Sequence, residues 1–167
     1  MNRGKKKKSK AISEKCHTNR CPYCGGPVVL RSADGIYREN KNSTMLYVCS
    51  NYPECDAYVR VGFENPSVPI GSLANGNLRA LRREAHRYFD QIYESGLMSK
   101  ADAYAWLSMI LAVPKSQAHI GYLGEYYCRE VIKESKQLLI NNQANPRRFE
   151  YQNKMNLGQN RVSSGGI

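Results

Sequence analysis

Two patterns of apolar residues follow one another along the chain. Between residues 16 and 63, short runs typical of β-strands are separated by turn sequences such as Asp34-Gly35. From residue 77 onward, apolar residues recur every three or four positions, which is the period of an amphipathic helix. This order predicts an α+β protein in which a small antiparallel β domain precedes a group of helices. The expected strands are 28–31, 45–49 and 58–63.

Start and stop signals divide the second block into three helices. Gly96 is expected to end the first helix, and Ser99 with Asp102 resembles a capping box that begins the second. The third helix is expected to start near Ser116 and to continue to about residue 142. Helices joined by short connections predict a small antiparallel bundle with its own core. The apolar face expected for the third helix is Ile120, Leu123, Tyr127, Val131 and Leu138.

Four cysteines of the first block form two short pairs. Two residues separate Cys21 from Cys24, and five separate Cys49 from Cys55. Tight turns of this kind can each present two sulfurs to one ion, and four thiolates suit Zn(II) better than a hard cation. Because four protein ligands leave no position for water, the ion is expected to be structural. The sequence therefore predicts a zinc ribbon with one structural Zn(II).

The remaining cysteines and histidines leave alternatives open. Cys16 and His17 precede the first pair and either substitute as ligands or take no part in metal binding. Cys128 lies within the third expected helix, where a cysteine usually acts as a small buried apolar residue. His86 and His119 could meet Cys128 in a second metal site, or they could be polar residues that close the bundle.

Net charge and length restrict the function further. The 167 residues carry a formal net charge of +11, and residues 1–10 hold six cations and no acid. A basic chain of this kind favours a polyanionic partner such as nucleic acid. The chain is too short for a large multidomain enzyme, and its longest apolar run is too short to span a membrane. The expected segments are a disordered basic arm at 1–15, the zinc ribbon at 16–63, a linker at 64–76, a three-helix domain at 77–143 and a disordered tail at 144–167.

The cysteine pairs resemble a known module. The sequences Cys21-Pro-Tyr-Cys24-Gly and Cys49-Ser-Asn-Tyr-Pro-Glu-Cys55 are similar to the C-terminal zinc ribbons of bacterial type IA topoisomerases. Those ribbons bind single-stranded DNA, so the resemblance implies a DNA-binding module. It does not imply strand passage, because the catalytic tyrosine domain of the topoisomerases has no counterpart in this chain.

A second resemblance covers the ribbon and the helices together. The motifs that carry it are Ala85-His86-x-x-Phe89-Asp90, Gly96-x-Met98-Ser99, Ala103-Tyr104-x-Trp106-Leu107, His119-Ile120-Gly121 and Cys128. Together with the ribbon, these motifs are similar to a zinc-finger-containing domain family of phages and prophages. This resemblance implies the architecture and a phage or prophage origin, but no activity. Because no targeting segment is visible in the sequence, we expect the protein in the bacterial host cytoplasm.

Aromatic and cationic residues of the ribbon are candidates for contacts with nucleic acid. Interleaved rings and cations can stack bases and neutralise phosphates, although tyrosines also fill the thin cores of small domains. On the first helix, cations recur at every fourth position, which either forms a stripe that faces phosphate or is a solvated face. The ribbon candidates are Arg31, Tyr37, Arg38, Tyr52, Tyr58 and Arg60, and the helix candidates are Arg79, Arg83 and Arg87.

These patterns favour a non-enzymatic protein that binds nucleic acid, with DNA preferred over RNA. Single-stranded or distorted DNA is the expected ligand, and low sequence specificity is expected because no set of base-reading residues is apparent. No catalytic constellation stands out in the sequence. The alternative is an adaptor or inhibitor that binds a host protein through its helical half, since tyrosine and arginine are also frequent in protein interfaces.

Overall fold

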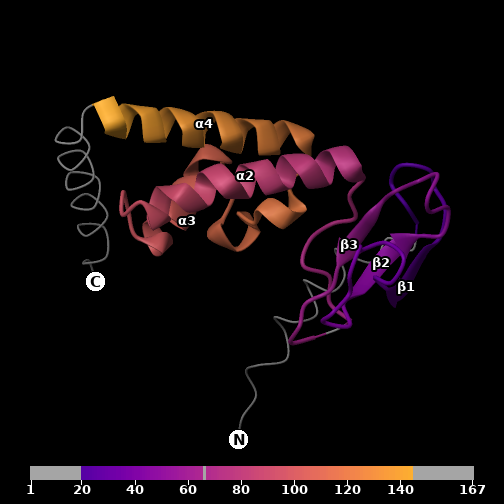
Figure 1. Ribbon diagram of the computed structural model, residues 1–167. Coiled ribbons are helices and arrows are strands. Elements are labelled where there is room, and N and C mark those ends of the chain that lie inside the picture. The colour runs from indigo at the N-terminus through magenta and orange to yellow at the C-terminus, as the bar shows by residue number, and fades with distance from the viewer. Residues whose placement is uncertain (1–19, 66, 145–167) are drawn as a thin grey trace, which may run out of the picture. The chain divides into compact units, whose positions relative to one another are not determined.

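A computed structural model describes residues 20–65 and 67–144 of the chain and has an α+β fold (Figure 1). A small antiparallel sheet is followed by three α-helices in the described residues. The predicted basic arm, Cys16, His17 and nearly all of the predicted tail lie outside the described residues. The strands are β1 (Val28–Ser32), β2 (Met45–Cys49) and β3 (Tyr58–Arg60), and the helices are α2 (Gly76–Glu94), α3 (Lys100–Ile110) and α4 (Glu125–Ala144).

The sheet has the order β1-β2-β3, with both neighbouring pairs antiparallel. In the register, Arg31 lies opposite Leu46, and Leu46 lies opposite Arg60. Residues directly opposite one another share a face of a sheet, so the two arginines flank Leu46 on the same face. The other residues of that face include Val48, which lies opposite Tyr58.

Strand β3 is shorter than predicted, because the chain folds back along it. The amide of Gly62 donates to Val68 O at 2.8 Å, and the amide of Ile70 donates to Arg60 O at 2.9 Å. Further along, Tyr58 and Ala74 exchange hydrogen bonds between their amides and carbonyls at 3.0 and 3.2 Å. The segment expected to be a linker therefore supplies backbone partners to the open edge of β3.

The signals predicted for the end of the first helix and for the start of the second are confirmed. Gly96 follows α2 and has a φ of 77°, a left-handed conformation that glycine adopts at low cost. Ser99 caps α3, and its Oγ accepts a hydrogen bond from the amide of Asp102 at 3.1 Å. The side chain of Phe89 on α2 contacts Tyr104 on α3, and Lys136 on α4 bonds Glu84 on α2.

The predicted start of the third helix is wrong. Helix α4 begins at Glu125, and two short 3₁₀ turns at 115–117 and 120–122 precede it. Glycine destabilises a helix, and Gly121 and Gly124 both lie in the segment where the helix was expected. Gly121 O also accepts a hydrogen bond from the amide of Ser72 at 3.0 Å, which a continuous helix would not allow. Tyr127, expected on the apolar face of this helix, is 46% exposed, whereas Val131 is buried.

The chain separates into two compact units. Of the described residues, those up to Arg83 together with His119–Cys128 form one unit, and Glu84–Ala118 together with 129–144 form the other. In the first unit, buried Ala33, Leu46 and Val48 form one small core cluster of the ribbon. In the second unit, Phe89, Ile92, Leu107 and Val131 are fully buried. No helix in the described part of the chain is long and apolar enough to cross a membrane.

Replacement of Gly71 by alanine is expected to destabilise the first unit. A methyl group at this position would overlap the carbonyl group of Gly121, which is backbone and cannot move aside easily. We expect Gly71→Ala to lower the free energy of unfolding by about 1–3 kcal/mol, as overpacking does elsewhere. Urea titration followed by circular dichroism measures this loss.

Gly124→Ala is the matched control, because a methyl group at that position meets nothing within 4 Å. It should leave the unfolding midpoint unchanged or raise it slightly, since alanine restricts the unfolded chain. Equal midpoints for the two variants would contradict the close approach of Gly71 to Gly121.

Candidate metal centre

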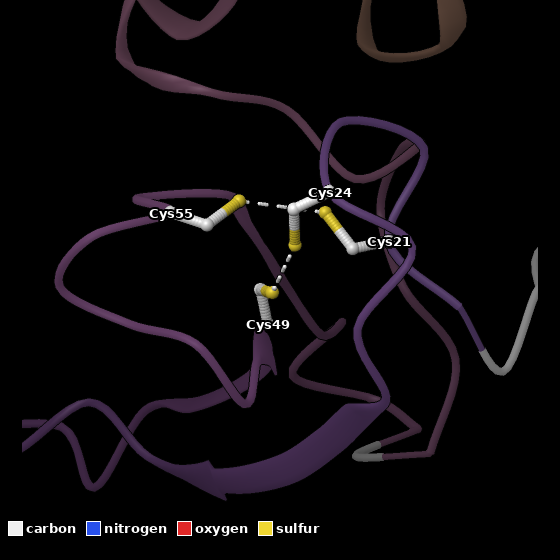
Figure 2. Close-up of side chains that lie close together, drawn as sticks. All are labelled: Cys21, Cys24, Cys49 and Cys55. Atoms are coloured by element: carbon white, nitrogen blue, oxygen red, sulfur yellow. Dashed lines mark hydrogen bonds between the residues drawn. The ribbon is translucent and has the colours of Figure 1, made fainter.

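The first pair of cysteines lies on a tight turn that precedes β1. The amide of Cys21 donates to Gly26 O at 2.7 Å, and the amide of Gly25 donates back to Cys21 O at 2.9 Å. Gly25 has a φ of 73°, a conformation that most side chains disfavour. The turn is therefore closed by its own backbone, and it carries Cys21 and Cys24 on the same side (Figure 2).

The second pair begins at the end of β2 and is held by similar bonds. The amide of Tyr52 donates to Cys49 O at 3.1 Å, and the amide of Cys55 donates to Asn51 O at 2.9 Å. The two turns are joined directly, because the amide of Ser50 donates to Pro27 O at 2.8 Å. This bond holds the second turn beside the first.

The four sulfurs converge, as Figure 2 shows, and all lie within 4.8 Å of one another. Cys24 Sγ is 3.3 Å from Cys49 Sγ, and Cys21 Sγ is 3.6 Å from Cys55 Sγ. Tetrahedral Zn(II) with Zn–S bonds of about 2.3 Å separates neighbouring sulfurs by about 3.8 Å. The arrangement and the chemistry of the donors therefore fit one zinc ion, and the four cysteines form a site for one structural Zn(II).

The electrostatics of the thiols depend on where each lies. Backbone hydrogen bonding at Gly26 and the neighbouring Cys49 thiol lower the pKa of the exposed Cys24 to about 6. The amide group of Asn51 also donates to Cys24 Sγ at 3.4 Å. Burial raises the pKa of Cys49 to about 12 in the metal-free protein. A cation at the centre supplies the positive charge that stabilises a buried thiolate. Metal binding and deprotonation of the thiols are therefore coupled.

Arg79, near the start of helix α2, donates hydrogen bonds to the residue that follows the second turn. Its guanidinium donates to Asp56 O and to Ala74 O, and it pairs with Asp56 Oδ2 at 3.1 Å. It also lies over the ring of Tyr58, 3.7 Å from the ring centroid. Arg79 was predicted from the sequence as a contact for nucleic acid, and in the structure both of its terminal nitrogens already donate to Asp56 or Ala74.

The tyrosines predicted to stack bases lie partly inside the ribbon. Tyr37, Tyr52 and Tyr58 all pack against the cluster around Leu46, and the rings of Tyr37 and Tyr58 meet edge to face with centroids 6.2 Å apart. Burial raises the pKa of the Tyr37 hydroxyl. Between the two roles that the sequence left open for these residues, the packing favours the core.

Most of the predicted arginines remain on the surface. Arg31, Arg38 and Arg83 are exposed, and Arg60 is half-buried. Arg87 is exposed as well, and its guanidinium lies 4.8 Å from the centroid of the Tyr88 ring. The ribbon thus presents separate cations around a small packed core.

Cys128 is confirmed as a buried apolar residue, with 0% of its surface exposed. Burial raises the pKa of its thiol. Among the described residues, the four cysteines of the ribbon form the group of metal-ligating side chains that is close enough to hold an ion. Of the residues considered for a second site, His119 and Cys128 belong to one compact unit and His86 to the other.

Sequence reasoning missed two residues that hold the first unit together. Asp56, directly after Cys55, accepts from the amide of Gly76 at 2.9 Å and so anchors the start of α2. Arg82 is buried, and its guanidinium donates to Leu123 O, Ser72 O and Ser72 Oγ. A signal for Arg82 existed, because it lies four residues after Leu78 and therefore on the apolar side of the helix.

Comparison with known proteins agrees with the metal site. The model of a family described as a zinc-finger-containing domain matches residues 17–138, which include all four ligand cysteines and most of the helical residues. No curated protein and no solved structure matches the chain.

Proposed function

The chain belongs to the family of zinc-finger-containing domains, and on this premise we propose that it is a non-enzymatic nucleic-acid-binding protein encoded by a phage or prophage. Its ligand in this proposal is single-stranded or distorted DNA, bound with low sequence specificity. The zinc ion has a structural role, because four thiolates leave no open position on the metal for a substrate.

The observation that supports this proposal most is the position of the cations on the ribbon. Arg31 on β1 and Arg60 on β3 lie on either side of Leu46, whose own side chain is buried in the ribbon core, in a sheet that the zinc site holds at one end. Arg38 lies exposed after the turn that follows β1. Cations held on one small folded unit can neutralise neighbouring phosphates and release their counterions.

The expected low specificity follows from the same residues. Phosphate contacts fix the position of a strand but carry no information about its sequence. The cations of residues 1–10 would add affinity of the same kind. A phage or prophage setting is supported by the resemblance of the helical motifs, for example Ala103-Tyr104-x-Trp106-Leu107.

The proposal predicts binding that weakens steeply with salt and that depends on the ribbon arginines. Anisotropy of labelled single-stranded DNA, duplex DNA and RNA is measured with the full chain over a salt series. Single-stranded DNA should bind most tightly. The slope of log K against log salt is negative, and for single strands each lost phosphate contact reduces its magnitude by about 0.7, so Arg31→Gln with Arg38→Gln should reduce the magnitude by about 1.4.

Lys133→Gln is the control, because it removes one exposed cation from α4, where Lys133 pairs with Glu130 and Glu134. It should leave the slope unchanged. A variant lacking residues 1–15 should bind more weakly but retain the preference for single strands. Complete loss of binding in that variant would assign the activity to the arm and contradict a role for the ribbon. If the full chain bound none of the three nucleic acids, the proposal would be wrong and the host-protein adaptor would remain.

A further inference from the structure

The most exposed aromatic ring of the ribbon is not one of the predicted tyrosines. Phe63, just beyond β3, is 67% exposed to solvent, whereas Tyr37, Tyr52 and Tyr58 pack on the ribbon core. Ile70, whose backbone is bonded to Arg60, is also 47% exposed. A side chain added at Gly62 would touch Ile70 Cγ2, so the Ile70 side chain lies along the same stretch of chain. Phe63 and Ile70 are thus two exposed apolar residues close to Arg60, and together we call them the Phe63 surface.

Arg60 contacts this surface and lies on the same face of the sheet as Arg31. Its guanidinium lies over the ring of Phe63, with Cζ 4.9 Å from the ring centroid. Stacking of this kind orients the ring and leaves its other face available to a second planar group. The pair is therefore arranged before any ligand binds.

The hydrogen bonding of Arg60 is incomplete. Its Nε is buried and has no acceptor among the described residues. A buried donor without a partner is unfavourable, so Arg60 Nε would gain from an acceptor that a ligand supplies. The guanidinium can turn toward an acceptor on a ligand without breaking a hydrogen bond at Nε. A phosphate oxygen is the acceptor that arginine binds most readily.

We propose that Phe63 and Arg60 form a stacking subsite for one unpaired nucleobase of a single-stranded nucleic acid. The base stacks on the Phe63 ring, and Arg60 donates to the phosphate beside it. Arg31, about 10 Å away across the sheet on the same face, takes a further phosphate. This inference rests on the proposed function and names the residue that supplies the stacking.

The chemistry of the surface favours a nucleic acid over a protein segment. Two arginines on one face, without a carboxylate paired to either of them in the described residues, match a partner with regularly spaced negative charges. A flat exposed ring beside them matches the face of a base, which is accessible only where the strand is unpaired. Duplex DNA offers the phosphates but hides the faces of its bases.

The test uses the zinc-loaded full chain and a labelled oligothymidylate as the probe. Phe63→Ala should weaken binding by about tenfold or more, because base stacking on an aromatic ring is lost. Phe63→Tyr retains the ring and should bind within about threefold of the parent protein. Met109→Ala, at a 70% exposed apolar residue of α3, is the matched control and should leave binding unchanged. Zinc content and circular dichroism verify that each variant is folded.

A tryptophan in place of Phe63 gives a second readout that does not depend on the alanine variant. In Phe63→Trp, the added fluorescence should be quenched as the oligonucleotide saturates the protein, whereas the parent protein, with Trp106 alone, should show little change. Equal binding by Phe63→Ala and the parent protein, with no quenching in Phe63→Trp, would overturn the subsite and leave the proposed function standing. Failure of the parent protein to bind any single-stranded probe would overturn both.

Discussion

Removal of zinc is expected to unfold the ribbon. Most buried residues of the ribbon belong to two small clusters, one around Cys21, Cys49 and Ala57 and the other around Ala33, Leu46 and Val48. Clusters of this size cannot offset the conformational entropy of about 40 ordered residues. In zinc-finger peptides a structural zinc site contributes on the order of 10–16 kcal/mol, which is more than the whole stability of most domains. We therefore expect the chelated protein to lose the amide signals of the sheet in a nitrogen–proton NMR spectrum.

Two single substitutions distinguish the loss of a zinc ligand from the loss of a buried cysteine that binds no metal. Cys49→Ala removes a ligand at the end of β2, and it should abolish stoichiometric zinc and the sheet signals together. Cys128→Ala removes the buried cysteine of α4, which is not part of the quartet, and it should keep one zinc per chain. Zinc is measured by mass spectrometry of the purified protein. A folded sheet in the chelated protein, or full zinc content in Cys49→Ala, would contradict the structural role of the ion.

Loss of the Phe89 ring is expected to be the most destabilising change in the second unit. Phe89 is 0% exposed, and its ring meets those of Tyr93 and Tyr104 edge to face at centroid distances of 5.9 and 5.1 Å. Phe89→Ala removes both the buried ring and these contacts and leaves a cavity. Substitutions of this kind cost about 3–5 kcal/mol, which urea unfolding followed by circular dichroism at 222 nm, a wavelength sensitive to helix, measures directly.

Phe63→Ala is a matched control for this experiment, because the same side chain is removed from a position that is 67% exposed. Its effect on the unfolding free energy should stay below about 1 kcal/mol. If Phe89→Ala cost no more than Phe63→Ala, Phe89 would not lie at the centre of the helical core. The pair also shows whether a weaker binder carrying Phe63→Ala is still fully folded.

The zinc site could be predicted because its information is local. Each cysteine pair lies on one turn, and the closing backbone bonds, such as that from Cys21 to Gly26, span only a few residues. To assemble the four ligands, the chain needs only one long-range contact, in which the first turn approaches the second. The end of α2 at Gly96 and the cap at Ser99 were predictable for the same reason.

The roles of the individual arginines and tyrosines could not be predicted in the same way. Arg79 and Arg83 lie four residues apart on the same helix and belong to the same predicted stripe. Arg79 nevertheless donates hydrogen bonds to Asp56 and Ala74, whereas Arg83 is exposed. The partners of Arg79 lie up to 23 residues away in the chain, so no local pattern identifies them. The tyrosines of the ribbon pose the same problem, because the amphipathic ring of tyrosine suits both a core and a surface.

The amino-acid sequence by itself determined the α+β class, the zinc ligands, the end of the first helix and the start of the second. Each of these depends on the spacing of residues that are close together in the chain. The tertiary structure alone decided that Gly121 meets Ser72 and delays the last helix to Glu125. It also decided that Phe63, and not one of the tyrosines predicted to stack bases, presents the most exposed aromatic ring of the ribbon. Burial depends on which distant segments pack over a side chain, and that is settled only when the whole chain has folded.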